Sequence, residues 1–291
     1  MISLQQLASL DLYLWLRGGD AAAQKLMVNQ STVSRQLHQT LRTFDLRMDR
    51  AGARASALKG DLSLLMAERE VHQMARLRGM APLRLDAAYS AGPWFSNALP
   101  AGWITGNFDL LGKAQPLQLL EERVIDAWIG SYQPDMPEPD HPTFLVLDLL
   151  RWPVHLLAAP DHPLAGERNL DPADLARFPS LALPSGWFPR TEAHLRAQNL
   201  WNDPVRMQRY DPSSWEGRSE DGVTMLYGSS FSEALQPGTI HLDWNLDLMA
   251  GDALVVRRDL AGEPAIEQLV GQLCLRAGEL SRRFEDVDLV C

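Results

Sequence analysis

Polar and basic side chains are concentrated on one face of a predicted helix between residues 30 and 42, where they could bind nucleic acid. The candidate DNA contacts in this segment are Gln30, Ser31, Thr32, Ser34, Arg35, His38 and Arg42. These side chains donate hydrogen bonds to phosphates or read base edges, and none of them is a carboxylate. Val33, Leu37 and Leu41 recur every four residues and predict a buried opposite face. The pattern favours a helix that enters a DNA major groove, although a solvated surface helix would carry a similar polar face.

The preceding residues supply the elements that would present this helix. Leucines recur at helical spacing at positions 4, 7, 10 and 14, and Gly18-Gly19-Asp20 then breaks the pattern, with Asp20 suited to capping a second helix. A short alanine-rich helix over residues 21–27 follows, and Asn29 is suited to capping the third. Two helices joined by a tight turn, the second with a polar and basic outer face, predict a helix-turn-helix.

Charge is distributed unevenly along the 291 residues. Residues 1–80 hold 11 Lys and Arg against 7 Asp and Glu, whereas the remainder holds 16 against 30, so a segment of net charge +4 precedes one of −14. A basic segment suits a polyanionic partner. The composition, 46% hydrophobic and 22% charged, is that of a folded globular chain and argues against disorder.

Beyond Pro82 the apolar pattern alternates between strand and helix. Strands are expected at 83–89, 103–111, 125–132, 145–150 and 153–158, and helices at 94–99, 116–124 and 263–284. This alternation predicts an α/β body with a mixed, largely parallel sheet covered by helices. Ligands of such sheets collect where loops leave the carboxyl ends of strands and where helix N-termini present N–H groups to anions.

The segment from Ala21 to Leu37 reads AAAQKLMVNQSTVSRQL and closely resembles the DNA-binding segment of LysR-type transcriptional regulators. Residues 159–165 and 181–186 resemble segments of the effector domain of that family. The resemblance implies that Arg50 and Arg54 are wing residues that contact DNA. It also implies an N-terminal all-α winged helix-turn-helix and an α/β body with a periplasmic-binding-protein-like fold, in which two subdomains enclose an effector cleft.

The same resemblance implies a division of the chain. A DNA-binding domain is expected over 1–60, a linker and dimerisation helix over 61–81, and an effector-binding regulatory domain over 82–291, with subdomain I at about 82–150 and 253–291 and subdomain II at about 151–252. Helical periodicity runs from about 58 to 80, where Leu64, Ala67, Val71 and Met74 form an apolar stripe. In this family the stripe pairs with the same helix of a second subunit, which implies a homodimer or a homotetramer.

Six residues are candidate effector contacts by resemblance: Ser90, Ala91, Gln115, Ser131, Ser185 and Trp187. The alternative for each is a role in a turn or a helix cap, which such residues often have without any ligand. Trp94, Trp128 and Trp187 are expected in or near the cleft, where an aromatic effector could stack, although core packing also accounts for tryptophan.

Three positions depart from the family pattern. Asp45 stands where the family usually has Gly, Met48 where it usually has Phe, and Ala57 where Thr is common, and the wing is about one residue short. A carboxylate at position 45 would repel nearby phosphates, which supply much of the affinity for DNA. We therefore expect DNA affinity or operator choice to be unusual.

Other classes of protein fit the sequence less well. It contains no Gly-x-Ser-x-Gly and no His-Glu-x-x-His, so neither enzymatic activity nor a metal or other cofactor is expected. No stretch reaches the roughly 20 apolar residues of a membrane span, and the N-terminus lacks the features of an export signal, which favours a cytoplasmic protein and disfavours a secreted solute-binding protein. Of the two cysteines, Cys274 is interpreted as a core residue, and no disulfide is expected.

The sequence thus predicts a DNA-binding transcriptional regulator whose activity is modulated by a small-molecule effector in its C-terminal domain. The expected partners are double-stranded DNA, the effector, a second copy of the chain and RNA polymerase. The alternative is a regulator that binds DNA without any ligand and acts through protein partners.

Overall fold

The computed structural model describes residues 2–49, 57–131, 134–207, 209–235 and 238–291. Its N-terminal part, here called the head, contains α1 (Leu4–Leu16), α2 (Gly19–Leu26), α3 (Gln30–Thr43), β1 (Arg47–Asp49), β2 (Ala57–Lys59) and α4 (Ser63–Leu77). A capping box begins α1, where Ser3 Oγ accepts a hydrogen bond from the Gln6 backbone at 3.2 Å and Gln6 Oε1 accepts one from the Ser3 backbone at 2.9 Å. Leucines of α1, α3 and α4 form the core of the head.

The turn between α2 and α3 is tight because Met27 adopts a left-handed backbone with φ of 53°. Asn29 is the N-cap residue of α3 as predicted, although its side chain makes no capping hydrogen bond. The predicted cap at Asp20 is wrong, since α2 begins at Gly19, two residues before the predicted start, and Gly18 is its N-cap. These two helices have the arrangement of a helix-turn-helix.

Asp45, just after α3, is another residue with a left-handed backbone. Asp45 has φ of 51°, a conformation that glycine adopts freely and aspartate tolerates better than most residues. It lies against Gly60, whose φ of 133° excludes other residues and where a Cβ would lie 3.0 Å from the Asp45 carbonyl oxygen. The two residues close the antiparallel pair β1–β2, in which Met48 lies opposite Leu58.

The body begins with a five-stranded sheet. This sheet and the helices packed on it are here called the first lobe. Its elements are β3 (Leu83–Ala87), α5 (Gly92–Phe95), β4 (Trp103–Thr105), α6 (Ala114–Glu121), β5 (Ala127–Gly130), β6 (Phe144–Asp148), β12 (Ala253–Arg257) and α10 (Pro264–Arg283), with 3₁₀ turns at Ser96–Ala98 and Arg258–Leu260. The strand order is β4-β3-β5-β12-β6. β3 pairs in parallel with β4 and β5, and β12 runs antiparallel to both β5 and β6. The strands β4, β3, β5 and β6 therefore share one direction and β12 opposes them, which confirms the prediction of a mixed, largely parallel sheet.

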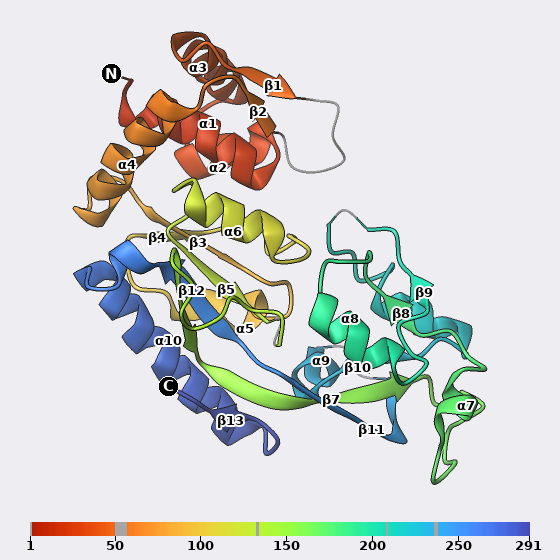
Figure 1. Cartoon of the computed structure of the whole chain (residues 1–291). Coiled ribbons are helices and arrows are strands. Elements are labelled where there is room, and N and C mark those ends of the chain that lie inside the picture. The colour runs from red at the N-terminus through yellow and green to blue at the C-terminus, as the bar shows by residue number, and fades with distance from the viewer. Residues whose placement is uncertain (1, 50–56, 132–133, 208, 236–237) are drawn as a thin grey trace.

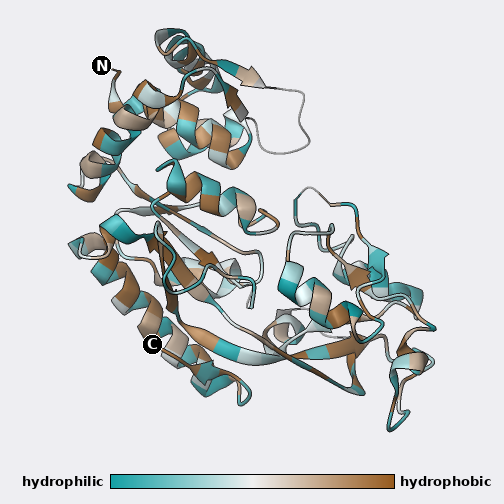
Figure 2. Ribbon diagram, in the orientation of Figure 1, coloured by the Kyte–Doolittle hydropathy of each residue, from teal (hydrophilic) through white to brown (hydrophobic). Residues whose placement is uncertain are grey.

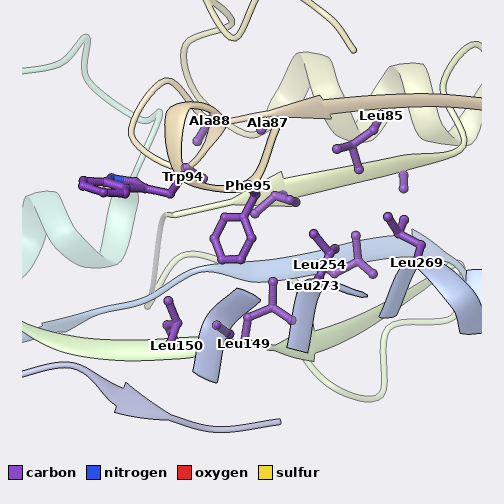
Figure 3. Close-up of a cluster of buried hydrophobic side chains, with 14 of the residues drawn as sticks. Leu85, Ala87, Ala88, Trp94, Phe95, Leu149, Leu150, Leu254, Leu269 and Leu273 are labelled. Carbon is purple, nitrogen blue, oxygen red and sulfur yellow. The ribbon is translucent and has the colours of Figure 1, made fainter. Parts of the chain in front are cut away.

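One face of this sheet is covered by α10 and α5. Leu269 and Leu273 of α10 are completely buried against β3, β5 and β12. Figure 3 shows Phe95 of α5 pointing into this cluster. The hydrophobic colouring of the central strands contrasts with that of α3, whose residues are mostly hydrophilic (Figure 2). One hydrophobic core of the first lobe therefore lies between the sheet and α10.

The remaining elements form the second lobe: β7 (Leu150–Ala158), α7 (Pro172–Leu175), β8 (Leu181–Ala182), α8 (Pro189–Arg196), β9 (Asp203–Pro204), a 3₁₀ turn (Glu216–Asp221), β10 (Leu226–Gly228), α9 (Ser230–Leu235) and β11 (Ile240–Ala250), with β13 (Asp288–Leu289) pairing on β7. The long strands β7 and β11 are antiparallel neighbours that connect the two lobes (Figure 1). β12 enters the first lobe directly from β11 without a crossover helix, which explains its antiparallel direction.

Two local expectations are corrected by the structure. The helix expected from residue 58 is α4, which begins only at Ser63 because residues 57–59 pair with β1 as a strand. Cys274 and Cys291 form a disulfide with a Cα–Cα distance of 5.8 Å, contrary to the expectation that no disulfide is present. The C-terminal residue lies beside α10 because β13 pairs with β7 and directs the chain back to that helix.

Candidate functional site

The polar face of α3 lies on the outside of the head. Gln30, Ser31, Arg35, His38 and Arg42 are exposed, and Thr32 and Ser34 are partly exposed. Val33, Leu37 and Leu41 on the opposite face are at most 6% exposed. The structure thus brings the seven predicted contacts of this helix together on one accessible surface, whereas Arg50 and Arg54 lie outside the described residues.

Two polar side chains of α3 are used inside the head instead. Gln36 Oε1 accepts a hydrogen bond from Ser9 Oγ at 2.6 Å, and Thr40 Oγ1 donates one to the Gln6 carbonyl oxygen at 3.3 Å. Both bonds connect α3 to α1, so α3 is held on α1 by polar and apolar contacts alike. This leaves residues 31, 35, 38 and 42, which recur at helical spacing, free to face a ligand.

A cleft of about 460 Å³ lies between the two lobes of the body. The first lobe contributes Tyr89, Ser90 and Ser131, and the connecting strands contribute Trp152 and Ala250. The second lobe contributes the remaining walls, which include Thr191, Glu216 and Tyr227. The volume is within the range of small-molecule sites, and a ligand held there would contact both lobes.

The six residues predicted to bind the effector occupy different places. Ser90 and Ser131 line the cleft. Ala91 is completely buried in the core of the first lobe, and Gln115 accepts a hydrogen bond from Arg17 of the head. Ser185 donates to Glu192, and Trp187 packs in the core of the second lobe, so the structure does not bring these four to the cleft.

The tryptophans that line the cleft are not those expected there. Trp94 and Trp128 are core residues of the first lobe, at 7% and 1% exposure. The cleft is lined instead by Trp152, Trp201 and Trp215. Trp201 and Trp215 belong to the segment 199–248, where the resemblance to the family is weakest, and no local pattern distinguishes them from core tryptophans.

One carboxylate in the cleft wall is held in a defined position. Glu216 Oε1 accepts a hydrogen bond from Tyr210 Oη at 2.6 Å, and the Tyr210 ring stacks on Tyr89 with centroids 3.8 Å apart. Glu216 Oε2 is buried and has no hydrogen-bond partner among the described residues. Burial raises the pKa of Glu216 above its usual value.

A second carboxylate lies behind Ser131 at the junction of the lobes. Asp252 is 1% exposed and accepts a hydrogen bond from Ser131 Oγ. Burial raises the pKa of Asp252 to about 7. The preceding Gly251 is required because a Cβ there would collide with the Leu150 carbonyl oxygen, where β7 and β11 meet. Asp252 lies between β11 and β12, where the chain passes from the second lobe to the first.

The head packs directly on the first lobe of its own chain, with α1 and α2 next to α6 (Figure 1). Leu12, Trp15 and Leu16 of α1 share one buried cluster with Leu119 and Leu120 of α6. Trp15 is 2% exposed. This contact explains why Gln115, at the start of α6, meets the head and not the cleft.

Charged residues are buried beside this apolar contact. Asp11 of α1 accepts from Arg69 Nε of α4 at 2.9 Å and from Arg84 Nη1 of β3 at 3.4 Å. Arg69 also bonds Glu122 at 2.8 Å, just beyond α6. Burial and, after it, the charge of the nearby Arg76 lower the pKa of Arg84 to about 10. α1, α4 and β3 thus meet at Asp11, and Glu122 extends the contact to the end of α6 through Arg69.

Asp126 is a second buried carboxylate that binds residues of both the head and the first lobe. Arg76 of α4 donates to both of its oxygens at 2.8 and 2.9 Å, and Gln73 donates to Oδ1 at 2.9 Å. The backbone N–H of Arg84 donates to Oδ2 at 2.9 Å. Bidentate pairing of this kind fixes orientation as well as distance. One face of α4 is therefore bound to the body of its own chain.

Asp86 completes the contact. Its Oδ2 accepts from Trp15 Nε1 at 2.5 Å and its Oδ1 from the Ala87 backbone at 2.8 Å. Burial raises the pKa of Asp86 to about 7, because these hydrogen bonds offset only part of the desolvation of the carboxylate. Trp15 is thus anchored to β3 by its indole nitrogen as well as by its packing.

The opposite face of α4 carries the predicted apolar stripe, which no other described residue of the chain covers. Leu64, Val71 and Met74 are 70%, 56% and 54% exposed, and Ala67 is exposed between them. Such a row of large apolar side chains along one helix is unusual on a surface that faces only water. The stripe is available to another molecule.

Among the described residues, no group of three or more His, Cys, Asp or Glu side chains is placed to hold a metal ion. Nor does any helix described in the structure have the length and apolar content needed to cross a membrane.

Comparison with known proteins gives one family and a set of similar structures. The model of the LysR substrate binding domain family matches residues 107–275. A full-length OxyR variant from Pseudomonas aeruginosa has a TM-score of 0.60 at 15% identity, covering 100% of this chain and 99% of that chain. ArgP from Mycobacterium tuberculosis has a TM-score of 0.56 at 15% identity, covering 95% and 98%. Full-length CbnR complexed with its target DNA has a TM-score of 0.54 at 14% identity, covering 94% and 99%.

These likenesses extend over nearly the full length of each protein and confirm the predicted fold class, a winged helical head followed by an α/β body. Among curated protein sequences, no significant match to the chain is found.

Proposed function

The chain belongs to the LysR substrate binding domain family, and from that membership we propose that it is a transcriptional regulator that binds DNA through α3 and responds to a small molecule in the cleft. One observation carries the proposal: a DNA-binding type of helix and a cleft of ligand size occur in one chain whose two parts are in direct contact. The solved structure of CbnR with its target DNA shows that this fold binds DNA in another protein.

The head supplies the DNA-binding surface in this proposal. Arg35 and Arg42 are exposed on the same side of α3 as Ser31 and His38, which allows base and phosphate contacts from one helix. Arg50 and Arg54 would add contacts from the wing. Asp45 is exposed at the end of α3, where its charge opposes phosphate, so we expect a lower affinity than a glycine there would permit.

A second copy of the chain would pair through the exposed stripe of α4. Leu64, Val71 and Met74 would bury their side chains in such a contact, and a twofold pair of heads would fit a roughly palindromic site. Larger assemblies such as a homotetramer are compatible with this pairing. A regulator of bacterial-type promoters works with RNA polymerase in the cytoplasm, so this partner and this location are part of the proposal.

The contact between head and body would couple the two sites. Because α1, α4, β3 and α6 meet at buried ion pairs, a change in the angle between the lobes would move the head with the first lobe. The effector must then bind one arrangement more tightly than another, and by linkage it binds differently with and without operator DNA. Equal affinities would support the alternative, a regulator that acts through protein partners without a ligand.

The domain division 1–60, 61–81 and 82–291 is retained as part of the proposal, with one qualification. The residues of 61–81 do not form a free linker, because Arg69, Gln73 and Arg76 bind the body. Ser90 and Ser131 are proposed as effector contacts. Enzymatic activity is not part of the proposed function.

The test is binding of the purified protein to its own upstream intergenic DNA over a series of salt concentrations. A regulator discriminates this fragment from random DNA, and the salt dependence counts the phosphate contacts. Replacing Arg196, an exposed arginine of the second lobe, with alanine gives a control that should not change the binding. Absence of any preference for the upstream fragment, even at low salt, would contradict the proposed DNA-binding function.

A further inference from the structure

The charges that line the cleft have one sign. Glu216, Glu220 and Glu233 belong to its wall, and no Lys, Arg or His does so among the described residues. Glu233 is paired with His241 at 2.7 Å, and Glu220 is exposed at the rim. Unlike these two, Glu216 has no cationic partner among the described residues and is only partly exposed. A second negative charge beside it, in a site of reduced dielectric, would be repelled.

Glu216 has one unsatisfied carboxylate oxygen. Its Oε1 accepts from Tyr210 Oη, and its Oε2 is buried without a partner among the described residues. A buried carboxylate oxygen in this condition loses the solvation that it had in water, and a donor that carries positive charge restores most of it. Burial raises the pKa of Glu216, and a bound cation would lower it again.

The rest of the wall is aromatic. The aromatic residues of the cleft are Tyr89, Trp152, Phe188, Trp201, Trp215 and Tyr227. Aromatic ring faces attract cations, and several rings around one site are the usual means of holding an organic ammonium group. Trp201 is 5% exposed, and its Nε1 is buried without a partner among the described residues.

We propose that the effector of this cleft is an organic ammonium compound, an amine cation on an aromatic or apolar body, whose charged nitrogen pairs with Glu216. This inference rests on the proposed function, since it identifies the class of ligand for the same cleft. It differs from the expectation drawn from helix N-termini in such folds, which favours anions. The cleft of about 460 Å³ has room for a bicyclic aromatic amine.

The experiment compares probes that differ only in charge. Phenethylamine and tryptamine are titrated calorimetrically into the full chain, next to phenylpropionate and indolepropionate, which carry a carboxylate in place of the ammonium. We expect the amines to bind at least about tenfold more tightly than the carboxylates. Glu216→Gln keeps the shape and the Tyr210 hydrogen bond, and it should weaken amine binding by about tenfold to a hundredfold.

The control is Glu220→Gln, which removes a charge of the same sign at the exposed rim of the same cleft. It should change amine affinity by less than about fivefold. Comparison of the four probes on the unaltered chain needs no variant, so the proposal is tested even if Glu216→Gln does not fold. Tighter binding of the carboxylates, no amine binding below about 1 mM, or equal loss in the two variants overturns the ammonium proposal.

Failure of this inference and failure of the proposed function give different results. If the carboxylates bind and the chain still selects its upstream DNA, only the ligand class is wrong. If the chain shows no DNA preference while the amines bind in a Glu216-dependent manner, the ligand class stands and the DNA-binding function falls.

Discussion

Replacing Asp11 with alanine perturbs the contact between head and body at its most buried charge. The carboxylate is 1% exposed, and the arginines that it binds, Arg69 and Arg84, are 0% and 6% exposed. Removal of one partner from a buried ion pair costs about 3–5 kcal/mol, because the remaining charge is left uncompensated. Arg69 keeps Glu122 at 2.8 Å and Arg84 keeps the Val124 carbonyl oxygen at 2.8 Å. We therefore expect a loss at the lower end, about 3 kcal/mol in the free energy of unfolding.

The loss of stability caused by Asp11→Ala should be large, and it should be greatest where the head meets the body. Urea denaturation gives the free energy, and amide hydrogen exchange shows which elements become less protected. We expect faster exchange in α1 and α2, where the head meets the body, and unchanged exchange in α8 of the second lobe. Asp140→Ala, at an exposed position of the body, is the matched control and should change stability by less than about 0.5 kcal/mol. A cost below about 1 kcal/mol for Asp11→Ala, with exchange in α1 unaltered, would refute the reasoning that these charges hold the head on the body.

Three other predictions concern separate parts of the molecule. Arg35→Ala should weaken binding to the specific site by about 1–3 kcal/mol in a fluorescence anisotropy titration, and an equal loss on random DNA would assign Arg35 to a phosphate instead. Burial raises the pKa of Asp86 to about 7 from 3.8, so its protonated form favours the native state and the free energy of unfolding falls as the pH rises from about 4 to about 7. Asp86→Asn should remove this fall, roughly 4 kcal/mol for about three pKa units, as measured by urea denaturation across that range; a slope like that of the unaltered chain would contradict it. Val71→Glu should convert the dimer to a monomer in light scattering, whereas Val290→Glu, at another exposed valine, should leave it dimeric.

The surface of α3 could be predicted from the sequence because the signal is local. Val33, Leu37 and Leu41 define the buried side of an amphipathic helix, and the polar side follows from them. The stripe on α4 is predicted for the same reason. Asp45 stands where glycine is usual in the family, and its positive φ explains that preference for glycine.

The other face of α4 could not be predicted, because its partners are distant in sequence. Arg69, Gln73 and Arg76 look like a solvated face, yet they are buried by acids at positions 11, 122 and 126. Pairing of this kind depends on tertiary structure and leaves no periodic signal. Gln115 was placed at the cleft for the related reason that nothing in the sequence shows α6 to be covered by the head.

The cleft was predicted as a feature but only partly as a set of residues. Ser90 and Ser131 were found from resemblance, whereas Trp201, Trp215 and Glu216 lie in a segment that resembles the family least. Whether a tryptophan lines a cavity or fills a core depends on the packing of both lobes. A lone glutamate carries no sequence signal of its burial.

The matched surfaces of α1 and α6 limit how such a protein can be re-engineered. Exchanging DNA-binding segments between regulators is an obvious way to connect a known sensor to a new promoter. Here a transplanted head would leave the indole of Trp15 and the guanidinium of Arg69 against a foreign body, without Asp86 or Glu122 to receive them. A working chimera would therefore have to carry β3 and α6 along with the head, so the smallest interchangeable module is larger than the DNA-binding segment itself.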